Sequence, residues 1–340
     1  MENNYNHIRR QLPRDIFRPY WPRLFPILFV FTLGIVGVVA ICTLGWPWYA
    51  QLSLGLLVGY CWSISGLLAH EILHGSVVRN QTAQNILGFL CFLPYLISPT
   101  FWRYWHNNLH HSHTQKIIMD PDAFPNLKIF RQSRFAQWMF PYTPGSRHKR
   151  SYLYLFYWFS FNAHVVQHYL RYRNKIFQKL KHERVNLELA MAFVIHILAL
   201  ILVRHENWLW AVLIPFLVMN YLPFSYISTN HNLSPLTKHN DPLANSLTVT
   251  NHPWLEFLHV NFGYHVEHHL YPTLSGVHLK KVHHLLRIEH PDHYCSMPKW
   301  KAICQLYKTP RVYKNANTLI HPESGQTYAL QDWRPPESHL

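Results

Sequence analysis

The composition of this 340-residue chain is that of a membrane protein rather than of an ordinary soluble domain. Hydrophobic residues make up 49% and charged residues only 14%, against about 25% charged in a typical globular chain. The net charge of +15 accompanies no nucleic-acid motif, and the positive-inside bias with attraction to anionic headgroups accounts for it. We therefore expect a membrane and no nucleic acid as partner. Five scattered cysteines exclude a disulfide framework.

The first predicted elements are two membrane-spanning helices joined by a short turn. Residues 24–69 contain no charged side chain. At about 1.5 Å per residue they make roughly 69 Å of helix, near twice a ~30 Å hydrocarbon core. Trp46, Pro47 and Trp48 lie at the midpoint, where a proline between interfacial aromatics favours a turn. We predict spans at about 25–45 and 49–69.

Two uncharged, aromatic-rich stretches follow, at residues 85–101 and 152–170. The first is broken by Pro94 and Pro99. We interpret both stretches as interfacial or re-entrant helices, and plain packing helices outside the membrane are an open alternative. A second hairpin of spans is predicted at about 187–203 and 208–228, with its turn in the charged segment between them.

The basic residues predict the orientation of the spans. Five arginines precede the first span and none lies in its short turn, so the positive-inside rule places the N-terminus in the cytosol. Each hairpin then leaves the cytosol and returns to it, which makes residues 70–185 and 229–340, with the C-terminus, a cytosolic cap. The sequence has no internal repeat or low-complexity linker, so we expect a single domain over residues 1–340.

Eight histidines fall into three clusters, in segments 70–74, 106–111 and 265–269. Residues i, i+3 and i+4 share a face of an α-helix, so the members of the first and third clusters converge. In the second cluster His106 and His110 share a face, whereas His111 is turned about 100° away and is able to serve a second ion. Imidazole suits iron, zinc and copper, and structural zinc is closed by four ligands. The clusters, which contain no cysteine, therefore point to iron held by nitrogen in a two-metal site.

The clusters read HEILHGS, WRYWHNNLHHSHT followed by DPDA, and NFGYHVEHHLYP. In order and spacing, from Gly66 to Arg287, they resemble the three histidine boxes of the integral-membrane fatty acid desaturase superfamily. The resemblance implies an all-α integral membrane protein, in which a four-helix stem carries a cytosolic helical cap that holds the metals. It also implies a non-haem diiron enzyme that uses O2 and two electrons to remove hydrogens from an unactivated alkyl chain.

The resemblance and the spacing give a candidate set of nine imidazoles for two iron ions. In this superfamily a further histidine after the fourth span commonly completes the site, and His231 is placed to do so. The predicted ligands are His70, His74, His106, His110, His111, His231, His265, His268 and His269. No catalytic residue beyond the metal ligands is predicted.

Other side chains near the boxes are candidates for supporting roles. Metal-bound imidazoles usually donate their other N–H to a carboxylate or a carbonyl. The candidates for this role, or for holding a metal-bound water, are Glu71, Asp120, Asp122, Asn230, Asn261 and Glu267. For the two aspartates, capping of a turn is an equal alternative. The apolar substrate needs a tunnel, with candidate wall residues Trp102, Trp105, Phe262 and Tyr264.

The reaction we predict is fatty acyl desaturation, the formation of a C=C bond. Hydroxylation, decarboxylation and carotenoid modification are alternatives within the same superfamily. A histidine-rich metal transporter is a distant alternative, because it would place its ligands along the spans rather than at their ends. The chain holds no His-Pro-Gly-Gly haem signature, so we expect a separate electron donor of ferredoxin or cytochrome b5 type. The acyl carrier, the double-bond position and the oligomeric state stay open.

Overall fold

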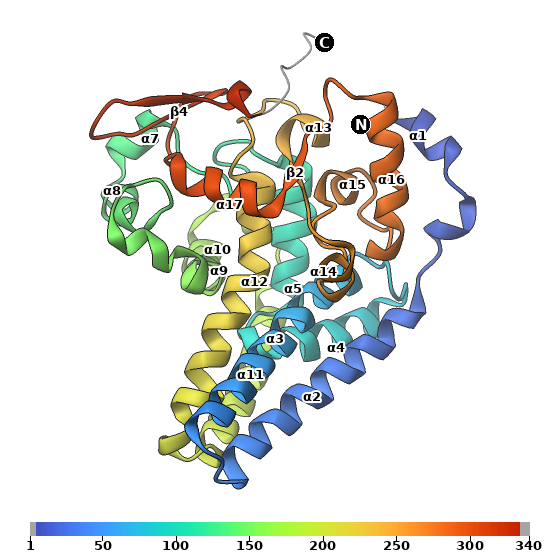
Figure 1. The fold of residues 1–340 in the computed structure, drawn as a ribbon, viewed down its shortest axis with the longest axis vertical. Helices are drawn as coiled ribbons and strands as arrows, with labels where there is room; N and C mark the ends of the chain where they lie inside the picture. The colour runs from blue at the N-terminus through green and yellow to red at the C-terminus, as the bar shows by residue number, and fades with distance from the viewer. Residues whose placement is uncertain (1–4, 334–340) are drawn as a thin grey trace. The chain divides into compact units, whose positions relative to one another are not determined.

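The computed structural model describes residues 5–333 and is mostly helical (Figure 1). The chain divides into two compact units. The apolar unit consists of Pro19–Trp105 and Leu155–Phe224, and the histidine unit consists of Met1–Arg18, His106–Tyr154 and Ser225–Leu340.

Four helices among the described residues are long and apolar enough to cross a membrane. The candidate spans are Trp21–Thr43, Trp48–Leu73, His182–Leu202 and Leu209–His231. They contain the helices α2 (Leu24–Thr43), α3 (Trp48–Leu73), α11 (His182–Leu202) and α12 (Ile214–His231). The prediction of a mostly helical protein with four candidate spans is confirmed. Helices α3 and α12 continue past the predicted ends of the second and fourth spans, at residues 69 and 228, into segments that carry predicted metal ligands.

Small residues let the long helices of the apolar unit approach closely. A Cβ atom at Gly34 of α2 would lie 2.7 Å from the Trp62 ring of α3, and one at Gly59 of α3 would lie 2.6 Å from the Val218 side chain of α12. Such contacts between small and large residues are typical of packing in lipid, where burial of apolar surface gives no driving force.

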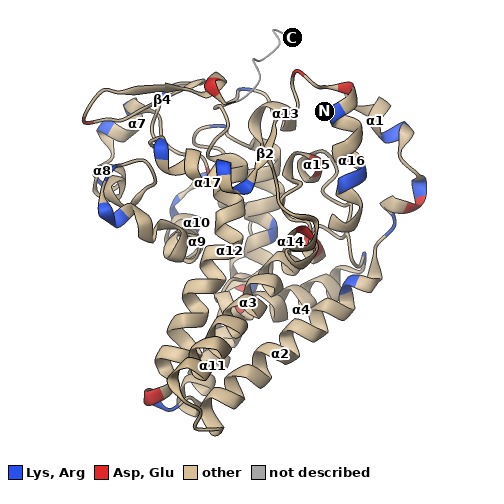
Figure 2. Cartoon of the chain, in the orientation of Figure 1, with Lys and Arg blue, Asp and Glu red and all other residues tan. Residues whose placement is uncertain are grey.

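The outer face of α2 is apolar and exposed. The side chains of Phe25, Leu28 and Phe29 are each more than 60% exposed, and α2 carries no Lys, Arg, Asp or Glu along its length (Figure 2). An exposed apolar surface of this extent is unfavourable in water and favourable in lipid. The helix therefore suits a bilayer.

A bent pair of helical segments, Gln81–Tyr95 and Pro99–His113, meets at 103°. It begins with α4 (Gln81–Phe92) and continues after the bend with α5 (Pro99–Arg103). Leu96 at the break has a left-handed φ of 53°, and Ser98 caps α5 by accepting a hydrogen bond from the Phe101 amide. The geometry is that of a broken span or a re-entrant loop, and it agrees with the predicted break at Pro94 and Pro99.

The histidine unit is built from short elements. Its helices are α1 (Asn6–Gln11), α6 (His111–His113), α7 (Leu127–Gln132), α8 (Arg134–Met139), α13 (Pro242–Asn245), α14 (Pro253–Leu258), α15 (His265–Leu270), α16 (Gly276–Glu289) and α17 (Lys299–Lys308). Helices α9 (Tyr154–Val165) and α10 (Arg171–Arg173) belong mainly to the apolar unit. Among the described residues, three π-helical segments interrupt the α-helices: Tyr104–His110, Val166–Leu170 and Leu209–Leu213.

Two small sheets complete the histidine unit. Strand β1 (Thr248–Thr250) pairs in parallel with β2 (Ser296–Pro298), and β3 (Tyr313–Asn315), β4 (Thr318–Ile320) and β5 (Thr327–Ala329) form an antiparallel sheet. The sequence analysis expected only helices. Each strand is three residues long, which is too short for an alternating pattern to reveal it.

The N-terminal segment belongs to the core of the histidine unit. Ile8, Leu12 and Ile16 are buried against Val282 and Leu286 of α16. This packing holds α1 against the side of α16 that faces away from α15 (Figure 1).

Candidate metal centre

Four buried imidazoles of the histidine unit point their Nε2 atoms at one another. His231 Nε2 at the end of α12 lies 3.2 Å from His110 Nε2 and 2.7 Å from His265 Nε2. His269 Nε2 lies 3.2 Å from His265 Nε2. Imidazole nitrogens bind first-row metal ions at about 2.0–2.1 Å, so neighbouring ligands of one ion are about 3 Å apart. The four side chains therefore fit one metal ion.

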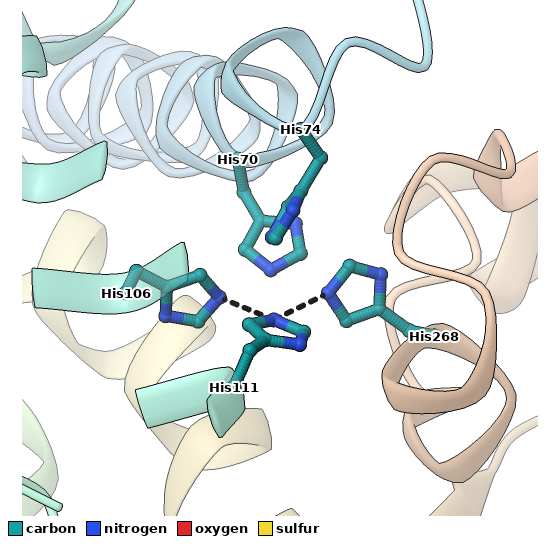
Figure 3. A group of neighbouring side chains, drawn as sticks. All are labelled: His70, His74, His106, His111 and His268. Atoms are coloured by element: carbon teal, nitrogen blue, oxygen red, sulfur yellow. Dashed lines mark hydrogen bonds between the residues drawn. The ribbon is translucent and has the colours of Figure 1, made fainter. Parts of the chain in front are cut away.

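A second set of imidazoles meets at His111. Its Nε2 lies 3.1 Å from His106 Nε2 and 3.2 Å from His268 Nε2 (Figure 3). These separations are again those of neighbouring ligands on one ion. Figure 3 draws the three with His70 and His74 of the apolar unit. His70 and His74 have ring centroids 4.7 Å apart, as expected for positions i and i+4 on α3.

The π-helical backbone explains how the second box divides its ligands. The rings of His106 and His110 are stacked 5.1 Å apart, but the coordinating nitrogen of His106 meets His111 and that of His110 meets His231. Residues 104–110 form a π-helix, whose i→i+5 bonding brings residues five apart to the same side. The expectation that His106 and His110 act together assumed an α-helix, and the structure differs for this reason.

The third box divides in a similar way. His265 and His269, at i and i+4 of α15, belong with His110 and His231, while His268 belongs with His106 and His111. One short helix thus supplies both sets of ligands from adjacent positions. The sequence spacing alone indicates convergence of the three but gives no basis for this division.

Asp120 contacts the ring nitrogen of His110 that does not face the other imidazoles. Its Oδ1 lies 3.0 Å from His110 Nδ1, and the carboxylate also accepts hydrogen bonds from the backbone amides of Gln115 and Asp122. Asp122 Oδ2 lies farther from His110 Nδ1, at 3.5 Å. Asp120 therefore has both of the roles that the sequence left open, since it contacts an imidazole and caps a turn.

The other two acidic candidates contact different groups. Glu71 is buried and pairs with Arg23 at 3.1 Å within the apolar unit. Glu267, on α15, is fully buried and its carboxylate contacts three polar side chains, Thr248, His283 and Tyr294. These contacts fix the helix that carries the third box.

The two asparagine candidates differ in environment. Asn230 precedes His231 on α12, is fully buried, and makes no side-chain hydrogen bond to any described residue. Asn261 has a left-handed φ of 61° in the turn before α15, and its carbonyl accepts from the Tyr264 amide. Asn adopts this conformation more readily than most residues, so Asn261 favours the turn that leads into the third box.

Burial favours the neutral form of two of the site imidazoles, His268 and His269. It lowers the pKa of His268 to about 3, with a further contribution from His110. The pKa of His269 is also lowered well below its usual value, first by burial and then by the neighbouring imidazoles. Metal ions bind the neutral imidazole, so ligands held unprotonated at pH 7 suit a metal site.

The candidate tunnel residues lie beside different imidazoles. The Trp102 ring packs against His70 and His74 with centroids 5.4 and 5.8 Å away. Phe262 packs against His265 at 5.5 Å. Trp105 packs against Phe101. Tyr264 points its hydroxyl at Glu256, 2.6 Å away.

Sequence reasoning missed side chains that brace these helices. His283 belongs to none of the three clusters, yet it is buried and contacts Glu267. Gln115 donates a hydrogen bond to the His231 carbonyl. His283 follows Leu279 and Val282 on the buried face of α16, so the helical period of that segment could have indicated its burial.

Comparison with known proteins adds to this geometry. A fatty acid desaturase family profile matches residues 45–300, which is more than half of the chain. The chain belongs to the fatty acid desaturase family. This desaturase is therefore a membrane oxidoreductase, and its family and site together indicate lipid desaturation at a histidine-rich metal site.

Relatives of this desaturase are themselves desaturases. A chloroplastic omega-6 fatty acid desaturase of Spinacia oleracea is 22% identical over 94% of this chain and 73% of its own length. An sn-1 oleoyl-lipid 12-desaturase of Synechocystis sp. is 20% identical over 92% of this chain and 91% of its own length. An sn-1 acyl-lipid omega-3 desaturase (ferredoxin) of Synechocystis sp. is 29% identical over 35% of this chain and 33% of its own length.

Proposed function

We propose that this desaturase introduces a C=C bond into an acyl chain of a membrane lipid, at a centre of two iron ions. The observation that carries the proposal is the arrangement of seven imidazoles in the histidine unit, whose Nε2 atoms face one another in two sets at ligand separations. An all-nitrogen donor set suits iron, and the chain contains four candidate spans that give it access to lipid.

The proposed ligands of one ion are His110, His231, His265 and His269. Those of the other are His106, His111 and His268, together with His70 and His74. The positive-inside rule supports this grouping, because it brings the inner ends of the spans and the later boxes to the cytosolic side. In this topology the spans form two hairpins and the histidine boxes share a cytosolic cap.

The iron centre supplies activation of O2 when two electrons reduce it. The balanced reaction takes one –CH2–CH2– unit, O2, two electrons and two protons, and gives –CH=CH– and two waters. The side chains of the protein position the metal ligands and the acyl chain. Asp120 fixes the orientation of His110, and the apolar rings of Trp102 and Phe262 beside box histidines exclude water and offer a wall to the acyl chain. The carboxylates near the site stay outside the proposed ligand set.

The proposed substrate is a lipid-linked acyl chain. Two Synechocystis relatives are named for activity on sn-1 oleoyl-lipid and sn-1 acyl-lipid, and the exposed apolar faces of α2 and α11 support contact of this chain with lipids. The proposed electron donor is a separate ferredoxin-type protein, because one of these relatives is named for ferredoxin.

Lipid analysis of a host that expresses the chain tests the proposal. We expect a new unsaturated acyl chain in the membrane lipids of cells that express the wild type, and none in cells that express His265→Ala at equal level. Mass spectrometry of intact lipids and of released fatty acids locates the product. A hydroxylated or chain-shortened product in the wild type, or a product confined to carotenoids, would replace desaturation with another reaction of the superfamily.

A further inference from the structure

The histidine unit contains a further group of side chains able to bind a metal, separate from the nine predicted iron ligands. His7 on α1 lies beside Glu289 and His290 at the end of α16, with one ligand atom of each within 4.8 Å of the others. The fatty acid desaturation proposed above makes no use of these residues. They join the N-terminal segment to a helix that is far away in the sequence.

The separations within this group fit one metal ion. His7 Nε2 lies 3.3 Å from His290 Nε2 and 2.9 Å from Glu289 Oε2. Two imidazole nitrogens at about 2.0–2.1 Å from a tetrahedral ion are about 3.3–3.4 Å apart. The two nitrogens face each other, as they do in the candidate metal centre.

Surrounding contacts hold the three side chains in place. Tyr5 donates a hydrogen bond to Asp241 at 2.8 Å, and its ring packs edge-on against the His290 ring. Gln11 donates a hydrogen bond to Glu289 Oε1, which leaves Oε2 toward His7. The ligands are therefore oriented before any ion binds, and orientation of this kind is what supporting contacts provide in metal sites.

The group is accessible to a metal ion from solvent. The side chain of His7 is 46% exposed and that of Glu289 is 24% exposed, so an ion can enter from solvent.

We propose that His7 Nε2, Glu289 Oε2 and His290 Nε2 bind a divalent transition metal ion of the zinc class, with water in the fourth position. Two imidazoles, one carboxylate and one open position form a donor set that suits this ion. The ion adds to the apolar packing of Ile8 and Leu12 and fastens the N-terminal segment onto α16. In the absence of metal, His7 and Glu289 form an ordinary surface ion pair.

The N-terminal segment that the ion would hold also lines a pocket of about 830 Å³ in the histidine unit. Gln11, Leu12 and Pro13, which directly follow α1, line it together with residues of α16 such as Lys281 and Arg287. A metal ion at His7 therefore stabilises one wall of this pocket.

Zinc binding to the iron-loaded protein tests the proposal. The protein is equilibrated with buffered micromolar free zinc, and zinc and iron per chain are measured together by mass spectrometry. We expect about one zinc per chain to bind without loss of iron, and His7→Ala and Glu289→Gln each to weaken zinc binding at least about tenfold. His284→Ala, an exposed histidine on the same helix, is the matched control and should bind zinc normally. Equal zinc binding in all variants, no zinc uptake, or uptake matched by iron loss would overturn the site.

Limited trypsin digestion tests, without relying on activity, whether the ion holds the N-terminal segment on α16. Arg9, Arg10 and Arg14 lie in and just after α1. Zinc should slow cleavage at these arginines in the wild type and in His284→Ala, and should leave His7→Ala unchanged. Cleavage that zinc does not slow in the wild type would show that no ion fastens this segment.

Discussion

At the residue scale, the Asp120 carboxylate has the most direct supporting role among the predicted partners. It is 4% exposed and contacts His110 Nδ1 while accepting two backbone hydrogen bonds. Asp120→Asn removes the charge that orients His110, so we expect metal affinity to fall by about 10–100-fold. Iron retained against a graded chelator measures this. Asp292→Asn, at an exposed position, is the control, and equal retention by the two variants would contradict the role.

His231 is the residue whose assignment goes beyond the three boxes. Its Nε2 contacts both His110 and His265. We expect His231→Ala to lose iron and product as fully as His268→Ala, because each removes a nitrogen from a buried set. Iron content and desaturated product are measured for both, with exposed His252→Ala as control. Near-normal iron and turnover in His231→Ala would mean that another group completes the site.

At the scale of elements, a buried polar network around Glu267 holds α15 in place. Tyr294 donates to Glu267, which also contacts His283 and Thr248. Tyr294→Phe removes a hydrogen bond to a buried carboxylate, so we expect the free energy of unfolding to fall by about 1–3 kcal/mol. Tyr328→Phe, which loses an exposed hydrogen bond to Arg147, should cost less than about 0.5 kcal/mol. Thermal unfolding of the two purified variants makes the comparison, and equal stabilities would contradict the network's role.

The spans were predictable because they depend on composition over a long window. The uncharged stretch is long enough, as a helix, to cross a bilayer about twice, and Trp46-Pro47-Trp48 interrupts it. Few arrangements other than two helices joined by a turn fit this pattern, and α2 and α3 do meet at that turn. The three-residue strands were not predictable, because their pairing partners lie far away in the sequence. Thr248 of β1, for example, pairs with Ser296 of β2.

The sequence also indicated that the site histidines cluster, but it did not indicate how they divide into two sets of metal ligands. Helical spacing indicates that His106 and His110 are neighbours, and their rings are stacked. Which nitrogen meets which partner depends on a local π-helix and on the end of α12, where His231 lies. Such backbone details are set by tertiary packing, which no local pattern reports.

At the scale of the whole molecule, we predict that the chain takes its electrons from a separate donor. Its 340 residues contain no haem signature, and the net charge is +15. Purified chain given only NAD(P)H and O2 should therefore be inactive, and a reduced ferredoxin-type donor should restore turnover. The rate should fall with ionic strength, because salt screens attraction between a basic enzyme and an acidic donor. Sustained turnover without a donor would reveal a redox group within the chain.

The iron content of the active protein tests the central claim most directly. Nine imidazoles in two sets predict about two iron atoms per chain, with turnover proportional to iron and no cysteine ligation. Metal analysis and activity are measured on the same preparations, reconstituted with iron or with zinc. The account predicts full activity at two irons per chain and none with zinc alone. Full turnover in protein that contains zinc and no iron would contradict it.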